Sequence, residues 1–416
     1  MFLGSLLILV VFAVLQSVLL CLQIWEHRRF ARKQVGRPVD AHPSGRALVV
    51  VPCKGTEFGL EENLRSVFLQ DYADYEIAFV VERPDDPAQA VIAALMKRHS
   101  HPRAQIIFAG QAADFGQKVH NLLAATRHLP VHIEYLAFID SDARAADGWL
   151  SALIHRLNER RKAAAVTGYR WFWPARTCLA HHLLYSINAG VAVGYGSQGV
   201  NPIWGGSWGI RRDRFDTLRV RECWRNGLSD DLIVSRAIYR KGLRIAFEPK
   251  AMVLSPIDTD FRETLTFMRR QMMVVRCYLP WLWGLALTAL TVSNIGLLVV
   301  LAVLLRHQVV LGAELWMFMG AGLILYGLGV FRGVLRTELF KVYFPAIEAR
   351  PRSSQLFDMI AWPLGNMLFW MVVLLSSVGT EITWRDVTYR VSKDGKTRIL
   401  NRKGPPGHAA GHLSDR

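Results

Sequence analysis

The two ends of the chain carry long apolar segments, and the middle carries short apolar runs separated by polar turns. Residues 1–25 are nearly free of charge and long enough to cross a bilayer, and a basic cluster follows at once. No small-residue cleavage site is evident. This order predicts an uncleaved transmembrane anchor over 1–25 with the N-terminus outside, then a basic linker over 26–45.

From residue 46 the apolar runs are the length of strands, and the segments between them have the spacing of amphipathic helices. Strands are predicted at 47–53, 76–82, 105–109, 135–140, 163–169 and 244–247, with helices at 61–69, 87–99, 116–129 and 149–161. Strands alternating with helices predict an α/β domain with a mixed, mostly parallel, doubly wound sheet. We expect this domain to occupy 46–278, with an interfacial segment at 176–194 that lies along a membrane.

The C-terminal part returns to membrane-like composition. Three apolar segments, 279–305, 309–330 and 356–378, predict a transmembrane region over 279–378, with a basic, aromatic interfacial stretch at 332–352. A basic tail over 379–416 follows, and its end, 404–416, is expected to be disordered. Four full crossings would place the tail outside, whereas its positive charge favours the cytosol. Either 356–378 is re-entrant or the tail is translocated despite its charge.

Composition fits a protein that is part membrane and part globular. The 416 residues are 51% hydrophobic, the mean hydropathy is +0.19 and the net charge is +16. Because Lys and Arg cluster beside the apolar segments, we assign the charge to topology and anionic headgroups and expect no nucleic acid partner. The five cysteines have no paired spacing, so they indicate neither a disulfide framework nor a zinc site.

The apolar run 135–140 ends on two acids one residue apart, Asp140 and Asp142. A parallel strand would deliver both to the carboxyl edge of the sheet, where open α/β folds bind ligands. Hard oxygen ligands at this spacing suit Mg²⁺ or Mn²⁺, with substrate phosphates filling the other positions. The alternative is a plain Asp-Ser-Asp turn after a strand. Further acids stand at the end of the predicted strand 76–82. Glu82, Asp85 and Asp86, together with Lys54 and Gly55 after the strand 47–53, should share one crevice with the Asp140 pair, as a nucleotide-diphosphate site requires.

Three later segments carry further candidate chemistry. The first segment contains Trp204, Gly205, Gly206 and Ser207. Its glycines would let the backbone approach an acceptor while the indole rings stack on it. The alternative is a tight turn with aromatic side chains packed under it. In the second, Asp230 and Asp231 start a predicted helix, and the acid not needed for capping could act as a general base. The third, 261–278, carries arginines for a diphosphate or for anionic lipid.

Six short segments resemble membrane-anchored family 2 glycosyltransferases of GT-A fold, most closely the ceramide glucosyltransferases and their hopanoid-glycosylating relatives: 80–88, 116–121, 139–142, 228–231, 269–276 and 382–390. The resemblance implies that Glu82 and Asp85 lie near the nucleotide base and ribose and Lys118 near the diphosphate. It also implies that Asp140 and Asp142 bind metal and diphosphate and that Asp231 is the catalytic base. Arg270, Gln271 and Arg276 are further donor candidates, and Asp230 joins the acceptor candidates. The family's usual final motif is not intact, because Gln271 and Arg276 are five residues apart.

The resemblance implies an inverting transfer of a sugar from a UDP-sugar to the hydroxyl of a membrane lipid, such as a ceramide-like lipid or a hopanoid. The protein would be an integral membrane protein, in a bacterial inner membrane, with its catalytic domain in the cytosol. Two alternatives stay open: a processive polysaccharide synthase of the same fold, and a non-catalytic membrane scaffold. A phosphatase with a strand-end Asp-x-Asp would want Thr or Val where the chain has Arg144.

Overall fold

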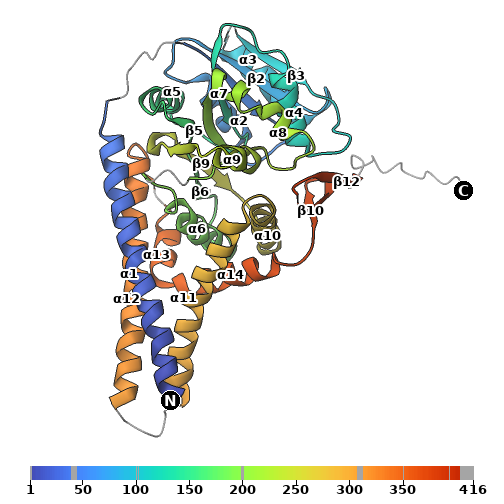
Figure 1. The fold of residues 1–416 in the computed structure, drawn as a ribbon. Helices are drawn as coiled ribbons and strands as arrows, with labels where there is room; N and C mark the ends of the chain where they lie inside the picture. Colours follow the sequence, from blue (N-terminus) through green and yellow to red (C-terminus); the bar gives the residue numbers. More distant parts are fainter. Residues whose placement is uncertain are drawn as a thin grey trace, which may run out of the picture.

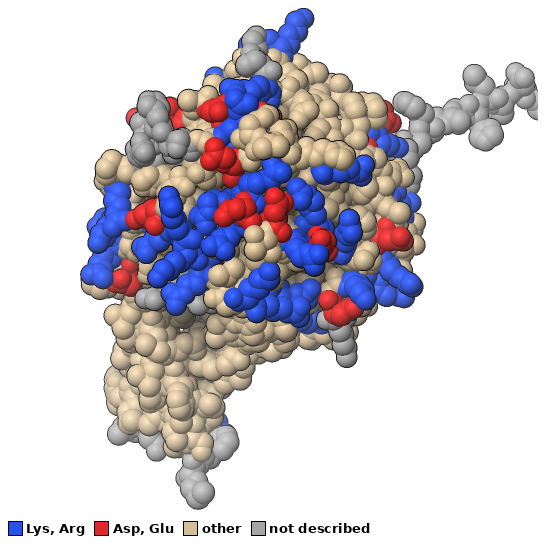
Figure 2. All heavy atoms as spheres, turned by 45° about the horizontal axis from the view of Figure 1, so that its top comes forward, with Lys and Arg blue, Asp and Glu red and all other residues tan. Residues whose placement is uncertain are grey.

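A globular α/β domain stands on a stalk of long helices (Figure 1). The computed structural model describes residues 2–38, 45–99, 101, 103–197, 201–306, 313–349, 351–392 and 394–402. The stalk contains α1 (Phe2–Val35), α11 (Pro280–Arg306) and α12 (Ala313–Tyr343). Each is long and apolar enough to cross a membrane. Figure 2 shows Lys and Arg spread over the globular domain, while the stalk is almost bare of charge, as expected of an integral membrane protein.

The globular domain is built around a seven-stranded sheet of order β3-β2-β1-β4-β7-β5-β8. Its strands are β1 (Arg46–Pro52), β2 (Tyr75–Val81), β3 (Ala104–Phe108), β4 (Ile133–Ile139), β5 (Ala163–Thr167), β7 (Ser207–Arg211) and β8 (Arg244–Phe247). Only β7 runs antiparallel to its neighbours β4 and β5. The mixed, mostly parallel sheet predicted from the sequence is therefore confirmed. Strand β7 itself was missed, because its residues follow two glycines and look like part of a turn.

Helices cover both faces of this sheet, which explains why its strands are apolar throughout. Along β1, Leu48 and Val50 pack toward one face, which is covered by α4 (Gln117–Thr126), α7 (Arg212–Thr217), α8 (Val220–Trp224) and α9 (Asp230–Arg240). Val49 and Val51 pack toward the other face, which is covered by α2 (Leu60–Phe68), α3 (Pro87–His99) and α5 (Trp149–Glu159). The alternation fixes the register and leaves the carboxyl edge of β1, β2 and β4 open for functional side chains.

Between the domain and the stalk lies a smaller layer. A two-stranded parallel sheet, β6 (Arg170–Pro174) and β9 (Val253–Ile257), meets α6 (Leu179–Ala192) and α10 (Phe261–Tyr278) there. A 3₁₀ turn, η1 (Pro249–Ala251), precedes β9. The segment expected to be interfacial, 176–194, is largely helix α6, and most of its side chains are buried against the surrounding elements.

One feature of the C-terminal region differs from the expectation, and a second bears on the alternative left open for 356–378. The stretch 332–352 was expected at the interface, yet α12 continues into it as far as Tyr343 as part of a spanning candidate. Its basic residues are accommodated because Arg332 and Arg336 are buried among helices, and Arg336 pairs with Asp358 of α13 at 2.7 Å. The apolar segment 356–378 is not one straight span: α13 (Arg352–Ile360) and α14 (Trp362–Leu375) meet at 81°.

The beginning of the tail folds into a three-stranded antiparallel sheet that the sequence analysis did not predict. Its strands are β10 (Glu381–Trp384), β11 (Val387–Val391) and β12 (Thr397–Arg402). Ile382, Val387 and Tyr389 are buried in the same core as β1 and β4, so this sheet lies on the domain's side of the membrane. Because α11 leaves that side and α12 returns to it (Figure 1), α13 and α14 begin and end on the domain's side, which favours the re-entrant alternative over a fourth crossing. Residues 404–416, expected to be disordered, lie outside the described residues.

Candidate functional site

Three charged side chains from distant segments meet at the carboxyl edge of the sheet. Asp140 directly follows β4, Lys118 lies in the first turn of α4, and Asp230 begins α9. The Lys118 Nζ atom lies 2.6 Å from Asp140 Oδ1 and 3.1 Å from Asp230 Oδ1. The fold thus brings together three residues that sequence reasoning proposed separately.

Burial sets the charge state of this cluster. Only 3% of the Asp230 side chain is exposed, and burial raises its pKa to about 7, opposed by Lys118 and reinforced by Asp231 and Asp140. Burial alone would lower the pKa of Lys118, but the carboxylates of Asp140, Asp230 and Asp231 outweigh it and raise the pKa. Lys118 is therefore an ammonium group at neutral pH, and it holds two acids in place.

Asp231 is oriented by hydrogen bonds from three donors. The backbone N–H of Gly205 donates to Oδ2 at 2.8 Å, and that of Leu232 donates to Oδ1 at 2.7 Å. The hydroxyl of Ser229, the N-cap of α9, also donates to Oδ1. Donors of this kind, at the start of a helix, fix the direction of the carboxyl group. Such a carboxylate can accept a proton from a nearby hydroxyl group.

The glycine-rich loop before β7 approaches these acids closely. A Cβ atom on Gly205 would lie 2.8 Å from Lys118 Nζ and 2.9 Å from Asp230 Oδ2, and one on Gly206 would meet the Trp204 ring at 2.2 Å. Trp204 is buried, and Ser207 is fully buried, donating to the carbonyl of Ala251 at 2.7 Å. The two glycines thus serve close packing beside the acids, while Trp204 and Ser207 pack beneath the loop.

Asp142 carries a free acceptor atom. Its Oδ2 accepts a hydrogen bond from Arg170 at 3.2 Å, while its Oδ1 is buried without a partner in the described part of the chain. Burial raises the pKa of Asp142, Arg170 opposes this shift, and Asp140 adds to it. An oxygen-only pair with one unsatisfied atom fits a hard divalent cation such as Mg²⁺ or Mn²⁺. The described residues form no cluster of three or more His, Cys, Asp or Glu for a metal, so Asp140 and Asp142 would need substrate oxygens as further ligands.

The acids at the end of β2 differ in their surroundings. Glu82 is buried, and its two oxygens accept from Lys54 at 3.0 Å and from Arg402 of β12 at 2.9 Å. Asp85 is turned to solvent, with 71% of its side chain exposed, and pairs with Arg83. Asp86 instead faces inward and accepts from the backbone N–H of Gly55 at 2.8 Å. Glu82 and Asp86 thus face inward at this edge of the sheet, whereas the Asp85 side chain faces solvent.

Of the three donor candidates on α10, only Arg270 is turned toward the acids. Burial lowers its pKa to about 10, Arg170 adds to this shift and Asp142 opposes it, so the three groups are electrostatic neighbours. Gln271 is exposed, and Arg276 donates to the carbonyl of Gly379, which lies between α14 and β10. Sequence reasoning missed Arg170 and Arg402, because neither stands in a motif, although Arg170 directly follows the predicted strand 163–169.

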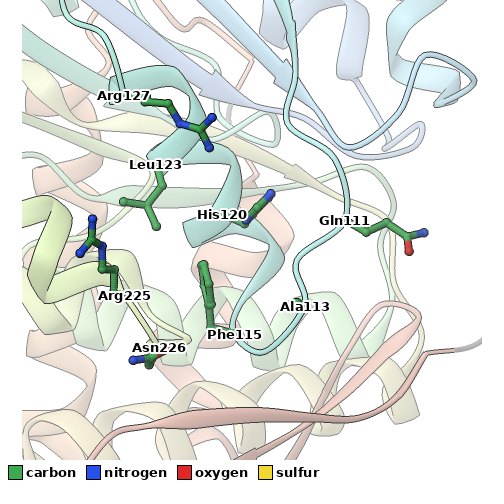
Figure 3. Close-up of a pocket in the computed structure, with 8 residues that line it drawn as sticks. All are labelled: Gln111, Ala113, Phe115, His120, Leu123, Arg127, Arg225 and Asn226. Carbon is green, nitrogen blue, oxygen red and sulfur yellow. The ribbon is translucent and has the colours of Figure 1, made fainter.

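A separate pocket of ≈ 380 Å³ lies on the outer side of α4 (Figure 3). Its lining comes from the loop before α4, from α4 itself and from the end of α8: Gln111, Ala113, Phe115, His120, Leu123, Arg127, Arg225 and Asn226. Arg127 and Arg225 are the C-cap residues of α4 and α8, where a cation complements the helix dipole. No predicted site residue lines this pocket, so the crevice of acids is the candidate active site.

Comparison with known proteins identifies the family. The profile of Glycosyl transferase family 21 matches residues 8–397, and the chain therefore belongs to this family. The likeness to ceramide glucosyltransferases expected from the sequence is confirmed by two relatives. Ceramide glucosyltransferase 1 of Caenorhabditis elegans is 34% identical over 79 residues, which are 19% of this chain and 17% of the relative. Ceramide glucosyltransferase of Komagataella phaffii is 30% identical over 136 residues, 32% of this chain and 26% of the relative.

The matched stretches thus span about a quarter or less of these curated relatives. Among solved structures, the mannosyltransferase PcManGT from Pyrobaculum calidifontis, in complex with GDP-Man and Mn²⁺, is similar with a TM-score of 0.44 and 13% identity. That likeness covers 88% of this chain and 98% of the other, and it is too weak to support a conclusion.

Proposed function

We propose that the protein transfers a sugar from a UDP-sugar to a hydroxyl group of a membrane lipid, with inversion at the anomeric carbon. The observation that carries this proposal is the carboxylate of Asp231, held by three donors beside Lys118, Asp140 and Asp230 at the open edge of the sheet. Membership of a glycosyltransferase family and the two ceramide glucosyltransferase relatives support the reaction class and the lipid acceptor.

The donor would lie along the carboxyl edge of β1, β2 and β4. Glu82 is at the end that would hold the nucleoside, and Lys118 and Arg270 supply positive charge where the diphosphate would lie. Asp140 and Asp142 would hold Mg²⁺ or Mn²⁺, which stabilises negative charge on a departing diphosphate. Lys118 keeps Asp140 oriented toward the same place through the 2.6 Å ion pair.

Asp231 would act on the acceptor. As the acceptor oxygen forms its bond to the anomeric carbon, its proton moves to Asp231 Oδ2 or Oδ1, and the bond from that carbon to the diphosphate breaks. The loop glycines Gly205 and Gly206 let the backbone approach the acids closely, and the backbone N–H of Gly205 directs Asp231 Oδ2. Proton transfer by a positioned side chain of this kind contributes about 10²–10⁴-fold to a rate.

The stalk would present the acceptor. A lipid held by its tail in the bilayer has to bring only its headgroup hydroxyl to the crevice, and such positioning lowers the entropic part of the barrier. Ceramide is the acceptor class that the names of the relatives suggest. We place the domain in the cytosol because basic residues gather in the last turns of α1, and we place the protein in a bacterial inner membrane on its resemblance to hopanoid-glycosylating enzymes.

The test is release of nucleotide by the full chain purified in detergent. UDP-glucose, UDP-galactose and other UDP-sugars are each incubated with and without total membrane lipid and with Mg²⁺, Mn²⁺ or a chelator. Release should need both lipid and metal, and Asp231→Asn should reduce it by about 10²–10⁴-fold. The matched control is Asp213→Asn, whose side chain is 70% exposed and distant from the acids in sequence.

Two results would contradict the proposal. Unchanged release in Asp231→Asn would remove the assigned base, and absence of both release and nucleotide binding would favour the scaffold alternative. A polymeric product instead of a glycolipid would indicate the processive synthase.

A further inference from the structure

A buried arginine outside every motif lies next to the acids. Arg170 is the first residue of β6, and only 10% of its side chain is exposed. Its guanidinium contacts one carboxylate, that of Asp142 at 3.2 Å. Its other neighbours are aromatic rings, with centroids at 4.7 Å for Phe172, 5.1 Å for Trp204 and 5.1 Å for Phe267. Aromatic faces fix the direction of a guanidinium without neutralising its charge.

A second arginine continues the same arrangement. The Phe267 ring is also 5.4 Å from the guanidinium of Arg270, which lies 5.3 Å from the ring of Trp384 on β10. Rings and guanidinium groups therefore alternate, and we call the set the arginine–aromatic stack: Trp204, Arg170, Phe267, Arg270 and Trp384. Among the described residues it has two cations and only Asp142 as a contacting anion, so it retains one positive charge.

Trp384 joins the stack because the C-terminal sheet is fastened to the edge of the crevice. Asp386 pairs with Lys54 at 2.7 Å, and Arg402 pairs with the buried Glu82 at 2.9 Å. The backbone N–H of Gln117, at the start of α4, donates to the hydroxyl of Tyr389 at 3.3 Å. This sheet therefore touches the crevice at both ends, beside Glu82 and beside Arg270.

We propose that Arg170 and Arg270 bind the diphosphate of the donor. Trp384 is a positioning residue that holds Arg270 in place, and β10–β12 therefore form one wall of the donor site. Guanidinium groups match phosphate oxygens with paired, charge-assisted hydrogen bonds. The free positive charge lies beside Asp142, where the proposed function puts the diphosphate, and the inference rests on that function. The ligand class that these two arginines recognise is a nucleoside diphosphate.

The experiment compares Trp384→Leu with Trp384→Phe in the full chain. Affinities for UDP, UMP and uridine are measured by calorimetry, together with KM and kcat for the donor. Loss of the stacking ring should weaken UDP binding between about twofold and thirtyfold, since a partly desolvated contact of this kind is worth about 0.5–2 kcal/mol. Uridine binding should not change, KM should rise more than kcat falls, and Trp384→Phe should restore most of the affinity.

Two further variants separate this role from a structural one. Trp316→Leu removes a tryptophan from α12 whose side chain is 62% exposed, and it should leave UDP affinity unchanged. Arg270→Lys keeps the charge and leaves the C-terminal sheet intact, yet it should weaken UDP binding as Trp384→Leu does, because an ammonium group lacks the planar fork.

The outcomes distinguish this inference from the function on which it rests. A wild-type chain that binds no nucleoside diphosphate, with uracil or guanine as base, would refute the proposed function itself. A wild type that binds UDP while Trp384→Leu binds it equally well would overturn only the positioning role. Equal loss of UDP and uridine binding, or no recovery in Trp384→Phe, would also overturn it.

Discussion

Gly205→Ala isolates the close contact between the glycine-rich loop and the charged cluster. The φ of Gly205 lies outside the left-handed region, so the backbone accepts alanine and the change acts only through the added methyl group. That carbon would lie 2.8 Å from Lys118 Nζ and 2.9 Å from Asp230 Oδ2, closer than the 3.0 Å that real Cβ atoms respect. Both side chains would have to withdraw, and their 3.1 Å ion pair would lengthen.

The structure sets the size of the expected effect. Overpacking of a buried site costs about 1–3 kcal/mol. Asp230 would also lose part of its ion pair with Lys118, its one cationic partner among the described residues. For a domain of this size, each kcal/mol lowers the unfolding temperature by about 2–4 °C, so Gly205→Ala should unfold about 2–12 °C earlier than the wild type. Donor binding should weaken as well, because Lys118 also orients Asp140.

The assay is thermal unfolding in detergent, followed by intrinsic fluorescence, with nucleotide affinity measured on the same samples. Gly190→Ala is the matched control, because a Cβ atom there meets nothing within 4 Å. Gly190 lies inside α6, so its replacement should raise the free energy of unfolding by about 0.5–1 kcal/mol. If Gly205→Ala unfolds and binds nucleotide as Gly190→Ala does, the close approach inferred for the loop is wrong.

Three further predictions follow from buried charges. Burial raises the pKa of Glu248 from 4.5 to about 7, so as pH rises this carboxyl group ionises in the unfolded chain before it ionises in the folded one, and stability should fall between pH 4.5 and about 7. Glu248→Gln should flatten that part of the curve of unfolding temperature against pH. An unaltered curve would refute the assignment. Arg336→Met alone should lower the free energy of unfolding by about 3–5 kcal/mol, because it leaves the buried Asp358 without its cationic partner. The double variant Arg336→Met, Asp358→Leu should regain stability in thermal unfolding. Asp142→Asn should abolish the stimulation of nucleotide release by Mn²⁺ while leaving uridine affinity intact, and retained stimulation would exclude Asp142 as a ligand.

The sequence predicted the sheet well because its central strands are apolar on both faces. In β1 every residue from Ala47 to Val51 is buried, and such a run is hard to place anywhere except between two layers of helices. The position of Asp140 and the start of α9 at Asp230 followed from the same reasoning, since one ends an apolar run and the other follows a capping serine. These are local signals, and no distant residue is needed to interpret them.

Strand β7 and the C-terminal sheet could not be predicted from local sequence patterns. Strand β7 follows a glycine pair, and its antiparallel direction depends on a place between β4 and β5 that the chain reaches only after a long excursion through α6. The strands β10–β12 are short and rich in charge, and a solvent-exposed pattern of that kind is also typical of a tail. Their apolar side chains find a buried surface only when the globular domain has formed.

The sequence by itself determined the layered sheet, the apolar helices and the acids at the strand ends, because burial and backbone geometry act over a few residues. Only the tertiary structure decided which charges meet. Lys118 reaches Asp140 and Asp230, Arg402 reaches Glu82, and Arg170 reaches Asp142 across separations of at least 22 residues. The register of the sheet and the loss of water around each charge decide which pairs form. Neither of these can be inferred from the spacing of residues along the chain.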